Sequence, residues 1–184
     1  MKNRTELAKY FASLGFKVGA EIGVCSGYYS EVLMNNIPGL KLYCVDSWDK
    51  YMMYKKFADR EAHQSYFEHA VKKLAPYNCE IIREYSMDAV KRFDDESLDF
   101  VYIDANHAYD FVKEDIREWA KKVRIGGIVS GHDYYVTRQG NRGVVDAVDE
   151  YIKEHGYEFN RTRWERTNPY KDDRQPSWFF VKTH

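Results

Sequence analysis

The chain has 184 residues, of which 44% are hydrophobic and 31% charged, a balance that is ordinary for a globular protein with a sizeable core. Its formal net charge of −1 provides no general attraction for nucleic acid or for an anionic membrane surface, so neither is an expected partner. The three cysteines, Cys25, Cys44 and Cys79, include no CxxC pair and are interpreted as reduced thiols, so we expect a cytoplasmic protein. The sequence shows no apolar run of about 18 residues that could span a bilayer and no apolar signal region at its start.

Strand and helix patterns alternate along the first half of the chain. Leu7, Tyr10, Phe11 and Leu14 recur at helical spacing, and Gly15 ends the helix that they predict. Short apolar runs predict three strands, over residues 18–24, 40–45 and 80–84. The segments with a helical pattern or composition are residues 28–35, 51–74 and 87–93.

The second half continues this alternation and then changes. Residues 98–103 form the clearest strand, and a helix over residues 111–122 leads through Gly126 and Gly127 into a fifth strand at residues 128–130. A helix over residues 144–154 follows. The tail predicts two further strands, over residues 157–163 and 178–182.

Strands that alternate with helices indicate parallel βαβ units with helices on both faces of the sheet. The last two strands have no helix between them, so we expect an antiparallel hairpin at one edge. The predicted fold is therefore a Rossmann-like, doubly wound α/β sheet of seven strands, mostly parallel, in a single domain over residues 1–184.

The turns after the first two strands suggest a nucleoside ligand, because ligands of such sheets bind beyond the carboxyl ends of the strands. The first turn contains Gly23 and Gly27, which allow a tight turn and a close approach of the backbone to a ligand. Asp46 follows the second strand, where a carboxylate can accept hydrogen bonds from both hydroxyls of a ribose. The glycine spacing differs from the dinucleotide pattern G-x-G-x-x-G, which favours a ligand without a pyrophosphate. An ordinary strand-to-helix turn that needs glycine remains the alternative.

These residues carry a specific resemblance. Glu21-x-Gly23-x-x-x-Gly27 followed by Val45-Asp46-Ser47-Trp48 resembles the first two motifs of the class I S-adenosylmethionine-dependent methyltransferases. The resemblance implies that Gly23 and Gly27 lie beside the methionine portion of S-adenosylmethionine, with Glu21 near its amino group.

The same resemblance assigns residues to the ribose and adenine portions of the cofactor. It implies that Asp46 holds the ribose hydroxyls and that Ser47 belongs to the same cofactor-binding segment. The residues after the third strand flank adenine in such enzymes, which points to Ser86 and Met87.

Polar clusters also follow the fourth and fifth strands. The first is Asp104-Ala105-Asn106-His107-Ala108-Tyr109, and the second is Gly131-His132-Asp133-Tyr134-Tyr135. Because neighbouring parallel strands end at the same edge, we expect the two clusters to lie close together. Two carboxylates and two imidazoles at one edge are costly unless something uses or neutralises them.

The pairing of D-x-x-H-x-Y with G-G-x-x-x-G-H-D-Y resembles the macrocin-type branch of O-methyltransferases, some of which methylate sugar hydroxyls. That resemblance implies that Asp104 and Asp133 are ligands of Mg²⁺ or Mn²⁺. It also implies that His107 is the general base, with Asp104 beside it in the catalytic set. One departure is His132, which stands where related sites carry an acid or amide; imidazole suits Mn²⁺ or Fe²⁺ better than Mg²⁺. A hydrogen-bonded structural pair of His132 and Asp133 is the alternative.

The predicted function is transfer of a methyl group from S-adenosylmethionine to a hydroxyl of a small molecule or sugar. Two alternatives stay open: a non-catalytic adenosyl-nucleoside binding protein, against which Asp104 and His107 count, and an NAD-dependent oxidoreductase, against which the glycine spacing counts. The expected partner is a small-molecule acceptor. Because we see no separate substrate-binding domain, a neighbouring subunit of a homo-oligomer is a candidate for closing the pocket.

Overall fold

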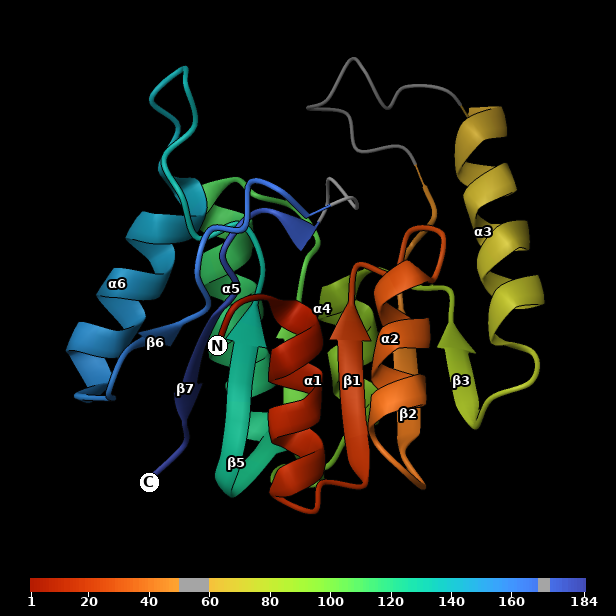
Figure 1. Cartoon of the computed structure of the whole chain (residues 1–184), viewed down its shortest axis with the longest axis horizontal. Coiled ribbons are helices and arrows are strands. Elements are labelled where there is room, and N and C mark those ends of the chain that lie inside the picture. The colour runs from red at the N-terminus through yellow and green to blue at the C-terminus, as the bar shows by residue number, and fades with distance from the viewer. Residues whose placement is uncertain (50–59, 169–172) are drawn as a thin grey trace.

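The computed structural model describes residues 1–49, 60–168 and 173–184, which form the predicted alternation of strands and helices around one sheet. Its strands are β1 (Val18–Ile22), β2 (Lys41–Val45), β3 (Cys79–Ile82), β4 (Leu98–Ile103), β5 (Val123–Gly131), β6 (Asn160–Arg161) and β7 (Trp178–Val181). They lie in the order β3-β2-β1-β4-β5-β7-β6 (Figure 1). Strands β1 to β5 are parallel, and β7 runs antiparallel between β5 and β6. The predicted Rossmann-like sheet of seven strands is confirmed.

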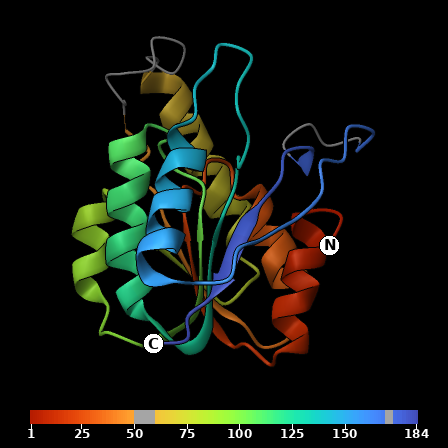
Figure 2. The same ribbon diagram turned by 90° about the vertical axis from the view of Figure 1, so that its left-hand side faces the viewer.

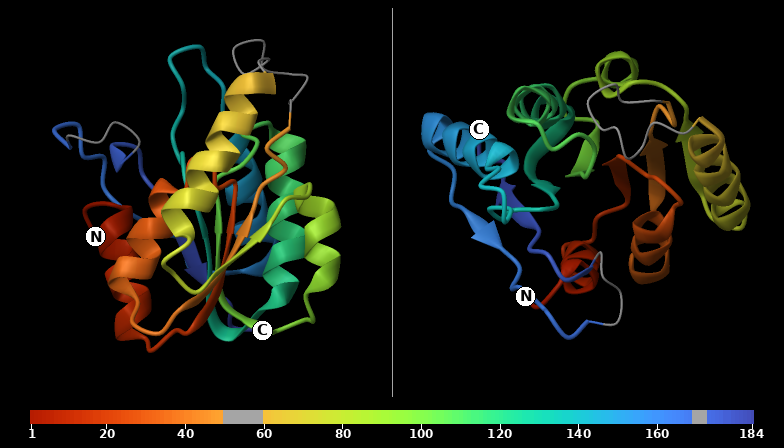
Figure 3. Two further views of the ribbon diagram at one scale, coloured as in Figure 1. Left: turned by 90° about the vertical axis from the view of Figure 1, so that its right-hand side faces the viewer. Right: turned by 90° about the horizontal axis from the view of Figure 1, so that it is seen from above.

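Helices cover both faces of this sheet (Figures 2 and 3). On one face lie α1 (Arg4–Ser13) and α2 (Tyr28–Asn36), with α3 (Arg60–Leu74) beside α2. On the other face lie α4 (Ser86–Ala89), the 3-10 helix η2 (Val90–Arg92), α5 (Tyr109–Lys122) and α6 (Gly143–His155). Each face has its own apolar core, and the sheet separates the two.

The residue pattern explains why the helices dock as they do. In α5, Val112, Ile116, Trp119 and Ala120 recur at helical spacing and are all buried against the sheet. The central strand β4 is apolar on both faces, as expected for a parallel strand with helices above and below it. None of the described helices is long and apolar enough to cross a membrane.

The fifth strand is longer than predicted. It begins at Val123, directly after α5, and contains both Gly126 and Gly127. A shift of register against β4 accommodates these glycines in the strand. A Cβ atom at Gly127 would lie 2.5 Å from the carbonyl oxygen of Asp99, so Gly127 makes a close strand contact, whereas Gly126 has a positive φ of 80°.

The observed boundaries of other strands and helices also differ from the predicted ones. β1 ends at Ile22 instead of residue 24, because Gly23 turns the chain with a φ of 93°. β6 is limited to the two residues that pair with β7. The helix predicted over residues 51–74 is observed as α3 from Arg60 onward, and residues 50–59 lie outside the described part of the chain.

The topology places the site. The chain winds from β1 through β2 to β3 in one direction and from β4 to β5 in the other, so the order reverses between β1 and β4. In Figure 1 the arrows of β1, β3 and β5 point to the upper edge of the sheet, and β2 and β4 run parallel to them. Ligands of doubly wound sheets bind at this reversal, beyond the carboxyl ends of the strands.

Candidate functional site

A cavity of about 440 Å³ lies at the reversal point, lined by residues that follow β1, β2, β4 and β5 and by the first residue of α1. The lining includes Arg4, Gly23, Asp46, Asp104 and Asp133. Candidate residues that are far apart in the sequence therefore share one hollow. What each contributes depends on its local contacts.

The two glycines of the first turn have different roles. Gly23 lines the cavity, and a Cβ atom there would lie 2.1 Å from the backbone oxygen of Asp104. This glycine therefore lets the end of β1 lie directly against the end of β4. Gly27 is not among the cavity-lining residues; it precedes α2 with a φ of 76°, and its position packs against Ala70 and Leu74 of α3.

Glu21 is buried at the floor of the cavity, where Ser30 Oγ donates a hydrogen bond to its carboxyl group. Burial disfavours the charged form and raises the pKa of Glu21 to about 8, although Ser30 and the nearby Arg4 act in the opposite direction. Glu21 is thus a neutral acid near pH 7 in the protein without ligand.

Asp46 ties the first turn to the second strand. Its Oδ2 accepts the backbone N–H groups of Val24 (3.0 Å) and Cys25 (2.9 Å), and its Oδ1 accepts that of Trp48 (2.8 Å). Burial raises the pKa of Asp46, against the effect of these donors. The carboxylate holds the turn in place, Oδ1 retains acceptor capacity, and Asp46 is among the residues that line the cavity. Ser47 lines the same cavity.

The two residues predicted to flank adenine differ in position. Ser86 lines the cavity, but its hydroxyl donates to Asp115 and accepts from Trp119 Nε1 at 2.8 Å. Asp115 is buried on α5, and burial raises its pKa to about 7. Met87 packs against the core on the α5 side and is not among the residues that line the cavity.

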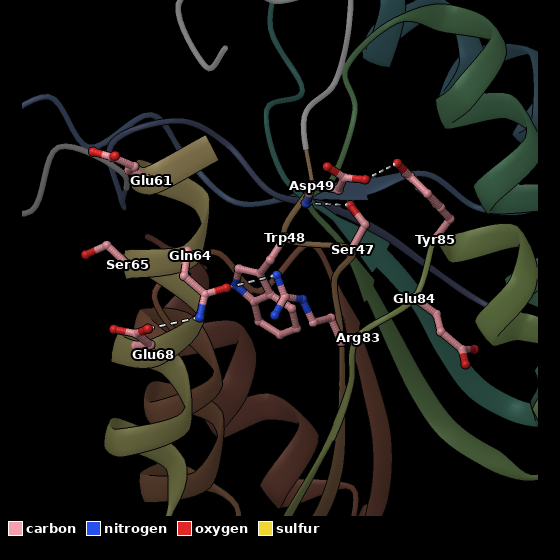
Figure 4. Close-up of a pocket in the computed structure, with 10 residues that line it drawn as sticks. All are labelled: Ser47, Trp48, Asp49, Glu61, Gln64, Ser65, Glu68, Arg83, Glu84 and Tyr85. Carbon is pink, nitrogen blue, oxygen red and sulfur yellow. Dashed lines mark hydrogen bonds between the residues drawn. The ribbon is translucent and has the colours of Figure 1, made fainter. Parts of the chain in front are cut away.

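An open groove continues from the cavity between β2, β3 and α3 (Figure 4). The two hollows share Ser47, Trp48, Asp49 and Glu84. Trp48 Nε1 donates to the carbonyl oxygen of Cys25 at 2.7 Å, which fixes the indole against the first turn. The groove therefore begins beside Asp46 and Ser47, the segment that was predicted to bind the ribose.

The ends of β4 and β5 bring Asp104, His107 and Asp133 together. His107 Nε2 lies 3.6 Å from Asp104 Oδ1 and 3.3 Å from Asp133 Oδ2. One ligand atom from each of the three residues falls within 4.8 Å of the others, which fits the donor set of a divalent cation. Asp133 has a left-handed backbone with a φ of 57°, an uncommon conformation that often marks a functional position.

The buried His132 contacts both carboxylates of this cluster. It is 5% exposed, and its Nδ1 lies 3.2 Å from Asp133 Oδ1 and 3.8 Å from Asp104 Oδ2. Burial opposes ionisation of Asp104, yet His132, His107 and Arg4 hold its pKa at about 2. Burial favours the neutral ring of His107, but the carboxylates of Asp104 and Asp133 raise its pKa overall. The cluster thus combines a strongly ionised carboxylate with an imidazole of increased basicity.

Sequence reasoning missed Arg4. Its guanidinium is buried, with Nε 2.5 Å from Asp173 Oδ1 and Nη1 3.4 Å from Asp104 Oδ2. The ring centroids of Tyr29 and Tyr28 lie 4.8 and 5.5 Å from its central carbon. One signal was present: Arg4 stands at helical spacing on the buried face of α1, where an unpaired charge is not expected.

Comparison with known proteins identifies the family of the chain. A family model described as a methyltransferase domain matches residues 20–134. No curated protein matches the chain in sequence.

Solved structures share the fold at low sequence identity. An O-methyltransferase from Bacillus cereus in complex with SAH is 16% identical, with a TM-score of 0.67 over 97% of this chain and 80% of that one. The O-methyltransferase TomG from Streptomyces achromogenes, involved in tomaymycin synthesis and in complex with SAM, is 18% identical, with a TM-score of 0.68 over 97% and 79%. Precorrin-6y C5,15-methyltransferase from Geobacter metallireducens is 16% identical, with a TM-score of 0.63 over 97% and 88%. The shared fold thus includes neighbours with different acceptors.

Proposed function

Because the chain belongs to a family of methyltransferase domains, we propose that it transfers the methyl group of S-adenosylmethionine to a hydroxyl of a small molecule or sugar. The observation that carries this proposal is the cavity itself. It joins the Gly23 turn, where the cofactor would bind, to the Asp104, His107 and Asp133 cluster, where a proton can be removed. The O-methyltransferases among the structural neighbours support the choice of oxygen as the acceptor atom.

The cofactor extends along the carboxyl edge in this proposal. Its methionine portion lies beside Gly23 and near Glu21, and its ribose meets the remaining acceptor capacity of Asp46 Oδ1. Adenine lies toward Ser47 and Ser86, at the start of the open groove. Gly27 acts through the packing of α2 against α3, and Met87 through the packing of the loop that carries Ser86.

His107 is the proposed general base. Methyl transfer is an in-line displacement from a sulfonium, and a hydroxyl is a weak nucleophile near neutral pH until its proton is removed. The side chain of His107 is 42% exposed at the cavity and lies between two carboxylates. Asp104 and Asp133 stabilise the imidazolium that forms when the ring accepts the proton.

The same carboxylates fit a divalent cation. Asp104 and Asp133 would hold it, and when bound it would supply Lewis acidity that lowers the pKa of an acceptor hydroxyl. As a ligand beside these carboxylates, the imidazole of His132 would favour Mn²⁺ over Mg²⁺.

Calorimetry with S-adenosylhomocysteine, the demethylated product, tests the first half of the proposal. We expect a dissociation constant in the micromolar range and no measurable binding of NAD. Absence of binding would exclude the methyltransferase function. Turnover is then tested with radiolabelled S-adenosylmethionine against a panel of hydroxylated small molecules and sugars, and tight binding without transfer to any acceptor would favour a non-catalytic nucleoside-binding protein.

A further inference from the structure

The cavity has a notable shortage of positive charge. Among the described residues that line it, Arg4 is the only lysine or arginine. The acidic side chains around it include Glu21, Asp46, Asp104 and Asp133. An anionic group that enters this hollow therefore meets one permanent cation, at the start of α1.

The proposed cofactor brings such an anionic group, the α-carboxylate of its amino-acid portion. Backbone N–H groups often bind anions in turns of this kind. Here four of those donors are already used. Gly23 N donates to Val45, Val24 and Cys25 donate to Asp46, and Gly27 N donates to Val24.

The first turn is therefore a poor anion site, because four of its N–H groups are already paired within the protein. The carboxylate needs another donor. The guanidinium of Arg4 lines the same cavity as Gly23, and its hydrogen bonds to Asp173 and Asp104 use only part of its N–H donors.

The surroundings of Arg4 hold the guanidinium in a fixed position. Asp173 is 3% exposed and accepts from Nε, and Tyr28 also donates to this carboxylate at 3.4 Å. The face of Tyr29 lies against the guanidinium, and Tyr29 Oη is anchored by a hydrogen bond to the backbone oxygen of Arg4 at 3.0 Å. Burying a charge is costly, and a buried arginine held this firmly is suited to recognising a carboxylate.

We propose that Arg4 binds the α-carboxylate of the methionine portion of S-adenosylmethionine, oriented by Asp173 and the two tyrosines. This inference rests on the proposed function, since it assigns a residue to the same cofactor. It adds a charged residue that lies outside both sequence motifs and makes α1 part of the cofactor site.

The test compares two ligands that differ at the amino-acid end. S-adenosylhomocysteine carries the α-carboxylate, whereas 5′-methylthioadenosine has the same nucleoside without the amino acid. In calorimetry, Arg4→Gln should weaken binding of S-adenosylhomocysteine by roughly 10- to 100-fold, the scale of one charge-assisted contact. Binding of 5′-methylthioadenosine should change by less than about twofold on the same scale. An equal loss for both ligands, or no loss for either, would overturn the assignment.

Two further measurements keep the test decisive if Arg4→Gln fails to fold. The double variant Arg4→Gln/Asp173→Asn leaves no unpaired buried charge, and it should show the same selective loss as Arg4→Gln. In the wild type, the analogue of S-adenosylhomocysteine that lacks only the carboxylate should also bind roughly 10- to 100-fold more weakly than the complete ligand. Wild-type protein that binds neither nucleoside would refute the proposed function itself. Equal wild-type affinity for the complete ligand and the analogue would refute only the role of Arg4.

Discussion

The two ends of the cavity use carboxylates in opposite ways. At β1 and β2, Asp46 accepts three backbone N–H groups and is thereby part of the scaffold. At β4 and β5, Asp104 and Asp133 face each other across His107 and contact mainly other ionisable side chains. A carboxylate that is satisfied by the backbone stabilises a shape, whereas carboxylates grouped with imidazoles retain charge for a ligand or for a proton.

The largest expected effect concerns chemistry at the second end. His107→Ala should lower turnover by roughly 10²–10⁴-fold, the usual contribution of a general base. Affinity for S-adenosylhomocysteine should change little, because the cofactor is proposed to contact mainly the β1 and β2 end. Single-turnover kinetics with an identified acceptor, together with calorimetry, separate the two quantities.

The matched control for this prediction is His69→Ala, on α3 and outside the cavity lining, which should leave both quantities unchanged. A His107→Ala protein with the wild-type rate would show that another group removes the proton. Asp104 would then be the next candidate.

Asp46→Ala tests the structural role of the carboxylate at the β1 and β2 end of the cavity. It leaves three N–H groups without their acceptor, so the free energy of unfolding should fall by about 2–4 kcal/mol in urea titrations. Asp133→Asn should change it by less than about 1 kcal/mol, because losing contacts with the histidines is offset by less repulsion from Asp104. Equal destabilisation by the two substitutions would contradict the view that Asp46 stabilises the structure and Asp133 does not.

Metal binding sharpens the comparison at the β4 and β5 end. Mn²⁺, followed by electron paramagnetic resonance, should bind more tightly than Mg²⁺, and Asp133→Asn should weaken Mn²⁺ binding by at least roughly 10-fold. The control is Asp110→Asn, on an exposed residue of α5 outside the cluster, which should not alter the titration. Full activity in excess EDTA would eliminate the metal while leaving the role of His107 intact.

The last prediction is a pH dependence of stability that comes from Glu21. Its pKa is about 8 in the folded protein, against an ordinary value of 4.5, so the folded state keeps a proton that the unfolded state loses between these values. Stability should therefore fall by about 1.4 kcal/mol per pH unit between pH 5 and 8, which is about 3–4 kcal/mol in all, and level off above that.

Glu21→Gln should abolish most of this slope and be more stable than the wild type at pH 8, as measured by urea titration at several pH values. Glu80→Gln, on a half-exposed side chain of β3, should leave the slope as it is. A wild-type stability that stays constant from pH 5 to 8 would contradict a protonated Glu21.

Much of the architecture was predictable from local patterns. The periodicity of apolar residues indicated the strands and helices of the sheet, and the carboxyl ends of parallel strands necessarily meet at one edge. This is why Gly23, Asp46, Asp104 and Asp133 could be expected in one region before their contacts were known. The boundaries of β5 and β6 were wrong because strand length is decided by pairing with a neighbour, and a local pattern does not reveal it.

By itself, the sequence determined the fold class and the segments that surround the cavity, because both follow from short-range periodicity and strand direction. Only the tertiary structure decided what individual side chains do there. Asp46, which was expected to hold a ribose, also accepts backbone N–H groups of the first turn, and Ser86 is turned toward Asp115. Arg4 meets Asp173 from the other end of the chain. Such pairings depend on the relative placement of distant segments, and the cost of burying an unpaired charge makes them specific once the fold brings those segments together.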